Sequence, residues 1–206
     1  MSKRIALFGG SFDPIHLGHT AVAADAALRI DADKVIFVPA KRSPLKAFFP
    51  QASDTDRCEM ISLAVADNPH FELSDYELKK NGPNYTLETV RYFKSRFDAG
   101  TSIFWLVGAD SIDDLPLWFA VTDLIDECNL SLMYRAGFPT PDFAKYAKLW
   151  GNARIDKLRK NIIPTPLVDI SSTEIRKRLA AGKDADDLLC PKVAQYIRSH
   201  DLYRNE

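Results

Sequence analysis

The feature that most constrains the fold of this chain is the alternation of short apolar runs with longer amphipathic stretches. The runs have the length of buried strands, and the stretches between them have the length and periodicity of helices. Such alternation is typical of βαβ units, in which helices connect parallel strands and cover both faces of a sheet. We therefore expect an α/β protein with a Rossmann-like, doubly wound parallel sheet and a small helical C-terminal subdomain.

Six apolar runs are the expected strands. They span residues 4–8, 34–38, 71–74, 102–107, 130–134 and 162–168. Pro164 and Pro166 place the last run at an edge, because proline cannot donate a hydrogen bond to a neighbouring strand. Helices are expected at residues 17–30, 54–66, 87–97, 172–181 and 191–199. Segments 40–51 and 138–151 are the least regular, and long loops in compact domains are often functional.

The composition suits an ordinary globular protein without a bulk affinity for polyanions. The 206 residues fit a single domain over 1–206, with a helical part over residues 170–206. The 27 basic and 28 acidic side chains leave a formal net charge of −1. This balance argues against binding nucleic acid along a charged surface and against lying on an anionic membrane.

The cysteines and the N-terminus indicate the compartment. Three widely spaced cysteines support neither a disulfide framework nor a thiolate zinc site. The apolar run at the N-terminus is too short for the core of a signal peptide, and no stretch approaches the length that crosses a bilayer. We therefore expect a cytoplasmic protein that does not bind membranes.

An eleven-residue segment directly after the first expected strand is the first candidate site. It reads GGSFDPIHLGH from Gly9 to His19. Gly9 and Gly10 would let the backbone turn sharply and let a phosphate approach main-chain N–H groups. His16 and His19 are three residues apart at a helix start, so both rings would face one ligand and could donate hydrogen bonds to phosphate oxygens. The segment lacks the GxGxxG spacing of dinucleotide-binding dehydrogenases, which argues against that class.

Two histidines at this spacing could alternatively bind zinc. The other histidines, His70 and His200, are far away in the sequence, and no cysteine pair supplies further ligands. We therefore expect no metal site built from protein side chains.

A second anion site is indicated by SSTEIR, which runs from Ser171 to Arg176. Ser171 and Glu174 match an S-x-x-E capping box, so helix capping explains part of the pattern. Consecutive hydroxyls, unpaired N–H groups and the positive end of a helix also bind anions. Arg176 adds a planar set of donors suited to phosphate oxygens. We expect this segment to bind phosphate.

The two segments together carry a family resemblance. The HxGH signature in the first resembles that of the nucleotidyltransferase superfamily, shared with class I aminoacyl-tRNA synthetases. The eleven-residue form resembles that of the bacterial nicotinate-nucleotide adenylyltransferases. Residues Ile170 to Arg176 match the ISSTxIR element of that family position for position, and the KMSKS-type loop of the synthetases is absent. The segments PLK, NYTLET, GADS and LWF extend the likeness over essentially the whole chain.

The resemblance implies which residues bind each substrate. Those expected to contact ATP are Gly9, Gly10, Ser11, Phe12, His16, His19, Gly108, Asp110, Ile170, Ser172, Thr173 and Arg176. Those expected to hold a pyridine mononucleotide are Lys46, Tyr85, Thr86, Trp118, Phe119 and Arg135. Trp118 could stack on the pyridine ring or could pack in the core. The sequence departs from the family pattern at Leu45, where a histidine usually precedes the lysine, and at Phe119, where a tyrosine is common.

The resemblance also implies a reaction in which the acceptor phosphate attacks the α-phosphorus of ATP and displaces pyrophosphate. Because the nucleophile is already an anion, the site needs no general base and must instead bring two anions together and neutralise charge. His16, His19, Lys46 and Arg176 are the expected catalytic donors, with Mg²⁺ bridging the phosphates. The expected partners are ATP and nicotinate mononucleotide, bound by a monomer or a homo-oligomer.

Alternatives remain open at this point. The acceptor could be nicotinamide mononucleotide, phosphopantetheine or a cytidylyl-transfer substrate, although pantetheine enzymes commonly carry a shorter turn without the Gly-Gly-x-Phe-Asp-Pro run. A nucleotide-binding sensor that has lost its chemistry is a second class, against which both phosphate segments are intact. A tRNA-binding module is a third, and the near-neutral charge disfavours it.

Overall fold

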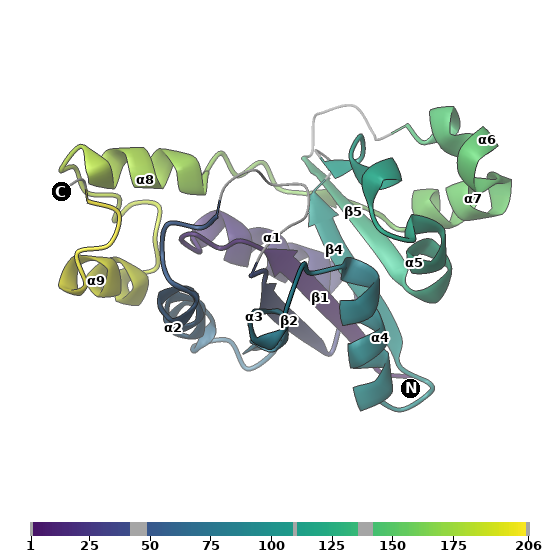
Figure 1. The fold of residues 1–206 in the computed structure, drawn as a ribbon, viewed down its shortest axis with the longest axis horizontal. Coiled ribbons are helices and arrows are strands. Elements are labelled where there is room, and N and C mark those ends of the chain that lie inside the picture. Colours follow the sequence, from purple (N-terminus) through teal and green to yellow (C-terminus); the bar gives the residue numbers. More distant parts are fainter. Residues whose placement is uncertain (1, 42–48, 109–110, 136–141, 205–206) are drawn as a thin grey trace.

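The computed structural model describes residues 2–41, 49–108, 111–135 and 142–204. Strands of these ranges form one six-stranded sheet in the order β3-β2-β1-β4-β5-β6, and every neighbouring pair is parallel (Figure 1). The strands are β1 (Arg4–Gly10), β2 (Lys34–Pro39), β3 (Phe71–Leu73), β4 (Ser102–Gly108), β5 (Asn129–Arg135) and β6 (Ile162–Thr165). The expected α/β, Rossmann-like fold is confirmed.

The strand order creates a point at which the direction of the chain across the sheet reverses. The chain runs outward from β1 to β3, returns to the other side of β1 as β4, and then runs outward to β6. In parallel sheets of this kind, ligands bind beyond the carboxyl ends of the strands at the reversal. Since β1 ends at Gly10 and β4 ends at Gly108, the segments that follow these two residues start at that place.

The last strand has the edge position that its prolines predict. β6 pairs only with β5 in the sheet order, and Pro164 lies opposite Tyr134. The strand ends at Thr165, three residues before the expected limit of 168, because Pro166 brings no N–H group to extend the ladder.

The helices of the described ranges connect the strands and then continue beyond the last one. They are α1 (Leu17–Ile30), α2 (Asp54–Val65), α3 (Tyr76–Lys79), α4 (Thr86–Arg96), α5 (Val121–Glu127), α6 (Ala147–Trp150), α7 (Asn152–Lys160), α8 (Ser172–Ala180) and α9 (Pro191–Ser199). Short 3-10 turns lie at Leu115–Leu117 and Ala144–Tyr146. Within the described ranges, no helix combines the length and the apolar character needed to span a bilayer.

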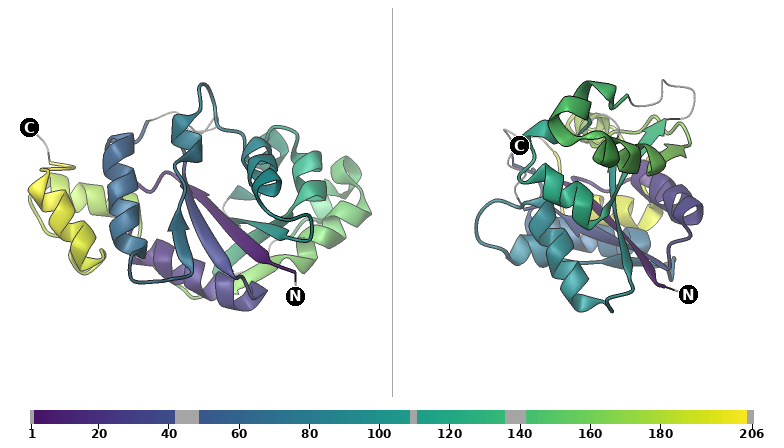
Figure 2. Two further views of the ribbon diagram at one scale, coloured as in Figure 1. Left: turned by 90° about the horizontal axis from the view of Figure 1, so that it is seen from below. Right: turned by 90° about the vertical axis from the view of Figure 1, so that its right-hand side faces the viewer.

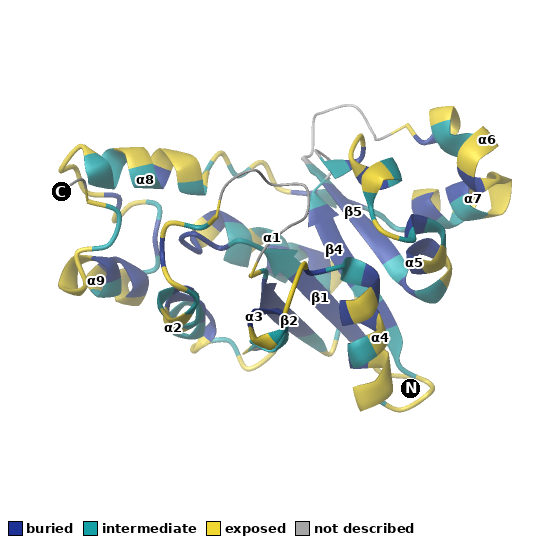
Figure 3. Cartoon of the chain, in the orientation of Figure 1, coloured by how far each residue is buried: buried dark blue, intermediate teal, exposed yellow. Residues whose placement is uncertain are grey.

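Both faces of the sheet are buried under helices, which explains why the strands are apolar almost throughout (Figures 2 and 3). Successive residues of β1 contribute to different cores. Ile5 and Leu7 belong to the core shared with α4, α5 and α7, whereas Ala6 and Phe8 belong to the core shared with α1 and α2.

The C-terminal helices extend the second of these cores. Ile175 of α8 and Val193 of α9 are buried in the same cluster as the residues of α1 and α2. α9 packs beside α2, and the hydroxyl of Tyr196 donates a hydrogen bond of 3.0 Å to Asp56 Oδ1 (Figure 1). This packing brings residues 200–204 to the side of the molecule where β1 ends.

Several helices were not predicted from the sequence. α7 has the sequence NARIDKLRK and buries only Ile155 and Leu158, so it offers too few apolar positions for its periodicity to be recognised. α5 has seven residues, and α6 falls in segment 138–151, which was expected to be irregular. Their helical state depends on packing against the sheet and against one another rather than on local pattern.

Candidate active site

The glycines at the end of β1 are required for packing and not for a sharp turn. Gly9 and Gly10 are the last residues of the strand and lie opposite Val38 and Pro39 of β2. A Cβ atom at Gly9 would lie 2.4 Å from Cζ2 of Trp105, and one at Gly10 would lie 2.9 Å from Cζ of Phe12. Aromatic rings therefore occupy the space that larger residues would need, which corrects the expectation of a sharp turn at these two glycines.

Phe12 supports the turn from inside. Its backbone is left-handed, with φ of 46°, and its side chain is only 1% exposed. The ring packs against Phe8, Phe37 and His19, with ring centroids 5.5, 5.7 and 5.0 Å away. Because the ring is enclosed, contact between Phe12 and a nucleotide is limited to the main chain.

The two histidines of the turn face each other, as their spacing predicts. Their rings are stacked with centroids 3.7 Å apart, and the main-chain N–H of His16 donates to Nδ1 of His19 at 3.3 Å. That bond leaves Nε2 as the donor of the His19 ring. Gly18 makes room for this arrangement, because a Cβ there would lie 3.0 Å from Nδ1 of His16.

His16 differs from a solvated imidazole. It is 7% exposed, and its Nδ1 has no hydrogen-bond partner among the described residues. Burial lowers the pKa of His16 to about 4, so its ring is neutral at pH 7. A neutral ring donates one hydrogen bond and brings no positive charge to the site.

The turn after β1 and the start of α8 lie in direct contact. Nη1 of Arg176 donates a hydrogen bond of 2.6 Å to the main-chain oxygen of Asp13, and the hydroxyl of Ser172 donates one of 3.0 Å to the oxygen of Pro14. These partners are 163 and 158 residues apart in the sequence. The turn and the start of α8 therefore converge in the fold, although they stand near opposite ends of the sequence.

The start of α8 has the cap that its sequence predicts. Ser171 is the N-cap and its hydroxyl accepts a hydrogen bond of 3.2 Å from the main-chain N–H of Glu174. Thr173 is exposed, and its Oγ1 accepts from Nη2 of Arg176 at 3.3 Å. Ile170 is half-buried against the core beneath α1 and α2. Exposed hydroxyls and an arginine thus surround the first turn of this helix.

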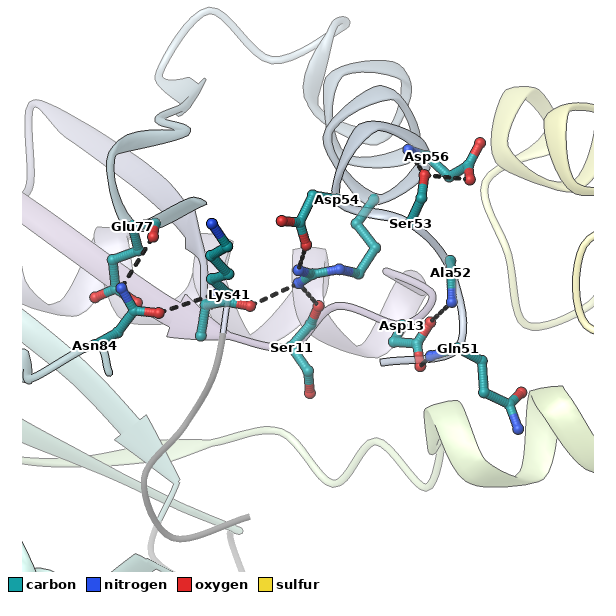
Figure 4. Close-up of polar contacts among 12 residues, drawn as sticks. Ser11, Asp13, Lys41, Gln51, Ala52, Ser53, Asp54, Asp56, Glu77 and Asn84 are labelled. Atoms are coloured by element: carbon teal, nitrogen blue, oxygen red, sulfur yellow. Dashed lines mark hydrogen bonds and ion pairs between the residues drawn. The ribbon is translucent and has the colours of Figure 1, made fainter. Parts of the chain in front are cut away.

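A buried arginine that the sequence analysis did not assign to the site fixes the other side of the turn. The side chain of Arg57 is 0% exposed and donates to the main-chain oxygens of Ser11 at 2.7 Å and Ala40 at 2.9 Å. It also pairs with Asp54 at 2.6 Å (Figure 4). The signal in the sequence was its spacing, since Arg57 precedes the buried Met60 by three positions on α2.

Asp13 is a second residue whose role the sequence did not reveal. Its side chain is almost fully buried and accepts main-chain hydrogen bonds from Gln51 at 2.8 Å and Ala52 at 3.0 Å (Figure 4). The Asp13 carboxylate therefore ties the turn to the segment that leads into α2.

The residues expected to bind the pyridine nucleotide form a more open surface. The rings of Tyr85 and Phe119 lie 4.6 Å apart, and Phe119 is 53% exposed. Thr86 is the first residue of α4 and is half-buried. Trp118 packs against the core shared with α4 and α5, which supports the core interpretation of this residue. The structure brings Tyr85 and Phe119 together although they are far apart in the sequence.

Two expected site residues fall outside the described ranges, and a third is described only in part. Lys46 and Asp110 lie outside the described residues. Arg135 is described only as the last residue of β5, opposite Thr165. Gly108 is the last residue of β4 and lies opposite Met133.

A buried acid supports the segment before α4. Glu77 is 4% exposed, and burial raises its pKa to about 7 although the Thr89 hydroxyl donates a hydrogen bond of 2.5 Å to it. The side chain of Asn84 donates to the main-chain oxygen of Glu77 at 2.9 Å and accepts from the main-chain N–H of Lys41 at 3.0 Å (Figure 4). Asn84 thus connects the end of β2 to Tyr85.

Comparisons with known proteins show the family to which this chain belongs. The chain matches the cytidylyltransferase-like family model over residues 7–178, a range that includes both phosphate segments. A relative from Clostridium tetani, named "Probable nicotinate-nucleotide adenylyltransferase", is 35% identical over 205 residues, with 98% of this chain and 100% of the relative covered. The chain belongs to the nicotinate-nucleotide adenylyltransferase family. This assignment confirms the resemblance drawn from the two motifs and makes the protein a nucleotidyltransferase.

Further similarities agree with the family. A protein of the same name from Neisseria meningitidis serogroup B is 36% identical over 201 residues, with 98% of each chain covered. In fold, this adenylyltransferase is similar to the Plasmodium falciparum nicotinic acid mononucleotide adenylyltransferase complexed with NaAD. That pair has a TM-score of 0.73 and 20% identity, and the match covers 98% of this chain and 97% of the other.

Proposed function

We propose that this enzyme transfers the adenylyl group of ATP to the phosphate of nicotinate mononucleotide, giving nicotinate adenine dinucleotide and pyrophosphate in NAD biosynthesis. The observation that carries the proposal is the contact between the two phosphate segments, in which Arg176 and Ser172 of α8 bond to Asp13 and Pro14 of the histidine turn. Nicotinate-nucleotide relatives at 35–36% identity support the acceptor.

The proposed triphosphate site uses donors from both segments. Nε2 of His19 and the N–H of the neutral His16 ring donate to phosphate oxygens, while Arg176 supplies positive charge. Main-chain groups of Gly9 to Phe12, Gly108 and Ile170, with the hydroxyls of Ser172 and Thr173, complete the ATP contacts. Fixed donors of this kind stabilise charge that develops on the leaving pyrophosphate without having to reorganise during the step.

The proposed acceptor site lies at the open side. Tyr85 and Phe119 present adjacent rings for the pyridine, and Thr86, at the start of α4, offers a hydroxyl to its carboxylate. We assign Lys46 to the acceptor phosphate, Arg135 to the acceptor and Asp110 to the ribose of ATP, from the family pattern. The phosphate of the acceptor attacks the α-phosphorus in line, and the bond to pyrophosphate breaks as the new P–O bond forms.

We also propose that Mg²⁺ enters the site with ATP. The described residues contain no group of three or more histidine, cysteine or acidic side chains arranged to hold a metal ion. The side chains around the turn and α8 are instead donors suited to phosphate oxygens. A magnesium ion held by those oxygens would neutralise charge on the triphosphate.

A steady-state comparison tests the function. Pyrophosphate release is measured with ATP and either nicotinate or nicotinamide mononucleotide, and we expect the acid to give the higher kcat/KM. A preference for the amide would overturn the acceptor assignment. No release with either acceptor would overturn the proposal in favour of a different acceptor or a nucleotide-binding sensor. We place this activity in the cytoplasm, which the three free cysteines support.

A further inference from the structure

The C-terminal tail reaches the turn through a single tyrosine. The hydroxyl of Tyr203 donates a hydrogen bond of 2.8 Å to Oδ1 of Asp13, which is 190 residues away in the sequence. Asp13 Oδ1 also accepts from the N–H of Ala52, and its Oδ2 accepts from that of Gln51. A carboxylate that is 5% exposed therefore joins the turn, the segment before α2 and the tail.

Two residues of the tail have a left-handed backbone. Tyr203 has φ of 63° and Asp201 has φ of 49°, in the left-handed region that residues with a side chain rarely adopt. Burial, followed by the nearby Asp13 carboxylate, raises the pKa of Tyr203, so the hydroxyl keeps its proton and remains a donor. Backbone strain of this kind persists only where surrounding contacts enforce it.

Asp13 is also the residue that holds Arg176. The guanidinium donates to the main-chain oxygen of Asp13 at 2.6 Å, and its Nη1 lies 3.8 Å from the Asp13 carboxylate. Nη1 is bonded to Asp13, and Nη2 is bonded to Thr173 of the same helix. The position of Asp13 therefore sets the direction in which the other N–H groups of the guanidinium point. A displacement of Asp13 would thus displace the phosphate donors of Arg176.

We propose that Tyr203 is a positioning residue of the adenylyl-transfer site, whose hydroxyl holds Asp13 so that Asp13 holds Arg176 in the orientation that binds the triphosphate. The inference rests on the proposed function. In this role Tyr203 acts through its hydrogen bond to Asp13. The tail of the chain is thereby a part of ATP binding.

The variant Tyr203→Phe tests this role, because it removes the hydroxyl and keeps the ring that packs against the core of α1 and α2. We expect the KM for ATP to rise about tenfold, the effect of losing one hydrogen bond to a charged group, while the KM for nicotinate mononucleotide stays within about twofold. In an Arg176→Ala background, the same change should raise the KM for ATP less than about twofold, because both act through one contact.

Tyr196→Phe is the matched control. Its hydroxyl also donates to a carboxylate, that of Asp56 at 3.0 Å, but it bonds to α2 and not to the turn. We expect it to change the melting temperature about as much as Tyr203→Phe and to leave the KM for ATP unchanged. An unchanged KM in Tyr203→Phe, or effects of Tyr203→Phe and Arg176→Ala that multiply, would overturn the inference.

The proposed function can fail separately. If the unsubstituted protein releases no pyrophosphate, calorimetric titration with ATP and Mg²⁺ still compares it with Tyr203→Phe. A dissociation constant about tenfold higher for the variant would support the positioning role even if the protein does not catalyse the reaction. Equal dissociation constants would refute it.

Discussion

The triphosphate side and the acceptor side of the proposed site are built in different ways. On the first, Arg57 and Arg176 donate four hydrogen bonds of 2.6–2.9 Å to partners that include the main-chain oxygens of Ser11 and Asp13. On the acceptor side, the segment before α4 contacts the segment before α5 through the rings of Tyr85 and Phe119, and Phe119 is half-exposed. One side is held in place before ligand arrives, and the other leaves its aromatic surface open.

This difference fits the two tasks of the reaction. Charge develops on the triphosphate during the step, and donors stabilise it best when they are fixed beforehand. The pyridine ring of the acceptor needs only to be recognised, and side-chain rearrangement on binding is common at such surfaces. We therefore expect changes on the triphosphate side to reduce catalysis or stability strongly and changes on the acceptor side to alter one KM.

The largest effect is expected for His19→Ala. Removing the Nε2 donor should lower kcat by about 100-fold to 1,000-fold, as for the loss of an oxyanion donor. Steady-state pyrophosphate release measures the rate. His70→Ala, which alters an exposed histidine away from the turn, is the control and should keep kcat. Near-normal turnover of His19→Ala would remove this residue from the mechanism.

The next largest effect is expected for Arg57→Met, which should lower the stability of the protein. Methionine fills part of the buried space but leaves the oxygens of Ser11 and Ala40 without their donor. We expect the free energy of unfolding to fall by about 3 kcal/mol, measured by urea denaturation. The control is Arg29→Met, because Arg29 makes an exposed i,i+4 pair with Asp25 and should cost less than about 1 kcal/mol. Equal losses in the two variants would contradict the buried role.

Glu77 should make stability depend on pH. Its folded pKa of about 7 lies above the ordinary 4.5, so the folded state binds more protons between these values and its stability falls as pH rises through this window. Glu77→Gln cannot ionise and should remove that fall, which makes it about 3 kcal/mol more stable than the parent at pH 8. Urea denaturation at pH 5 and pH 8 tests this, and parallel pH dependence in both proteins would contradict it.

The smallest effect is expected on the acceptor side. Phe119→Leu removes the ring contact with Tyr85 and should raise the KM for nicotinate mononucleotide about threefold to tenfold, the value of an aromatic pair. The KM for ATP should not change. Leu28→Ala, at an exposed apolar residue of α1, is the control and should alter neither KM. A change in the KM for ATP instead would show that the two sides are coupled.

Much of the fold could be predicted because its signals are local. Apolar runs indicated every strand of the sheet, and α1 and α9 begin and end at the expected residues. The cap at Ser171 was readable from SSTEIR, since a cap depends on residues three positions apart. α7 was missed for the complementary reason, because its helical state depends on neighbours that its own nine residues do not reveal.

The sequence by itself determined the parallel α/β architecture and displayed the two family motifs from which phosphate binding is proposed, since strand length, helix periodicity and capping are properties of short segments. Only the tertiary structure decided that Gly9 makes room for Trp105, that burial leaves His16 neutral, and that Asp13 receives the hydroxyl of Tyr203. These properties depend on atoms that come from distant parts of the chain, and they arise only when packing brings those atoms into contact and excludes water.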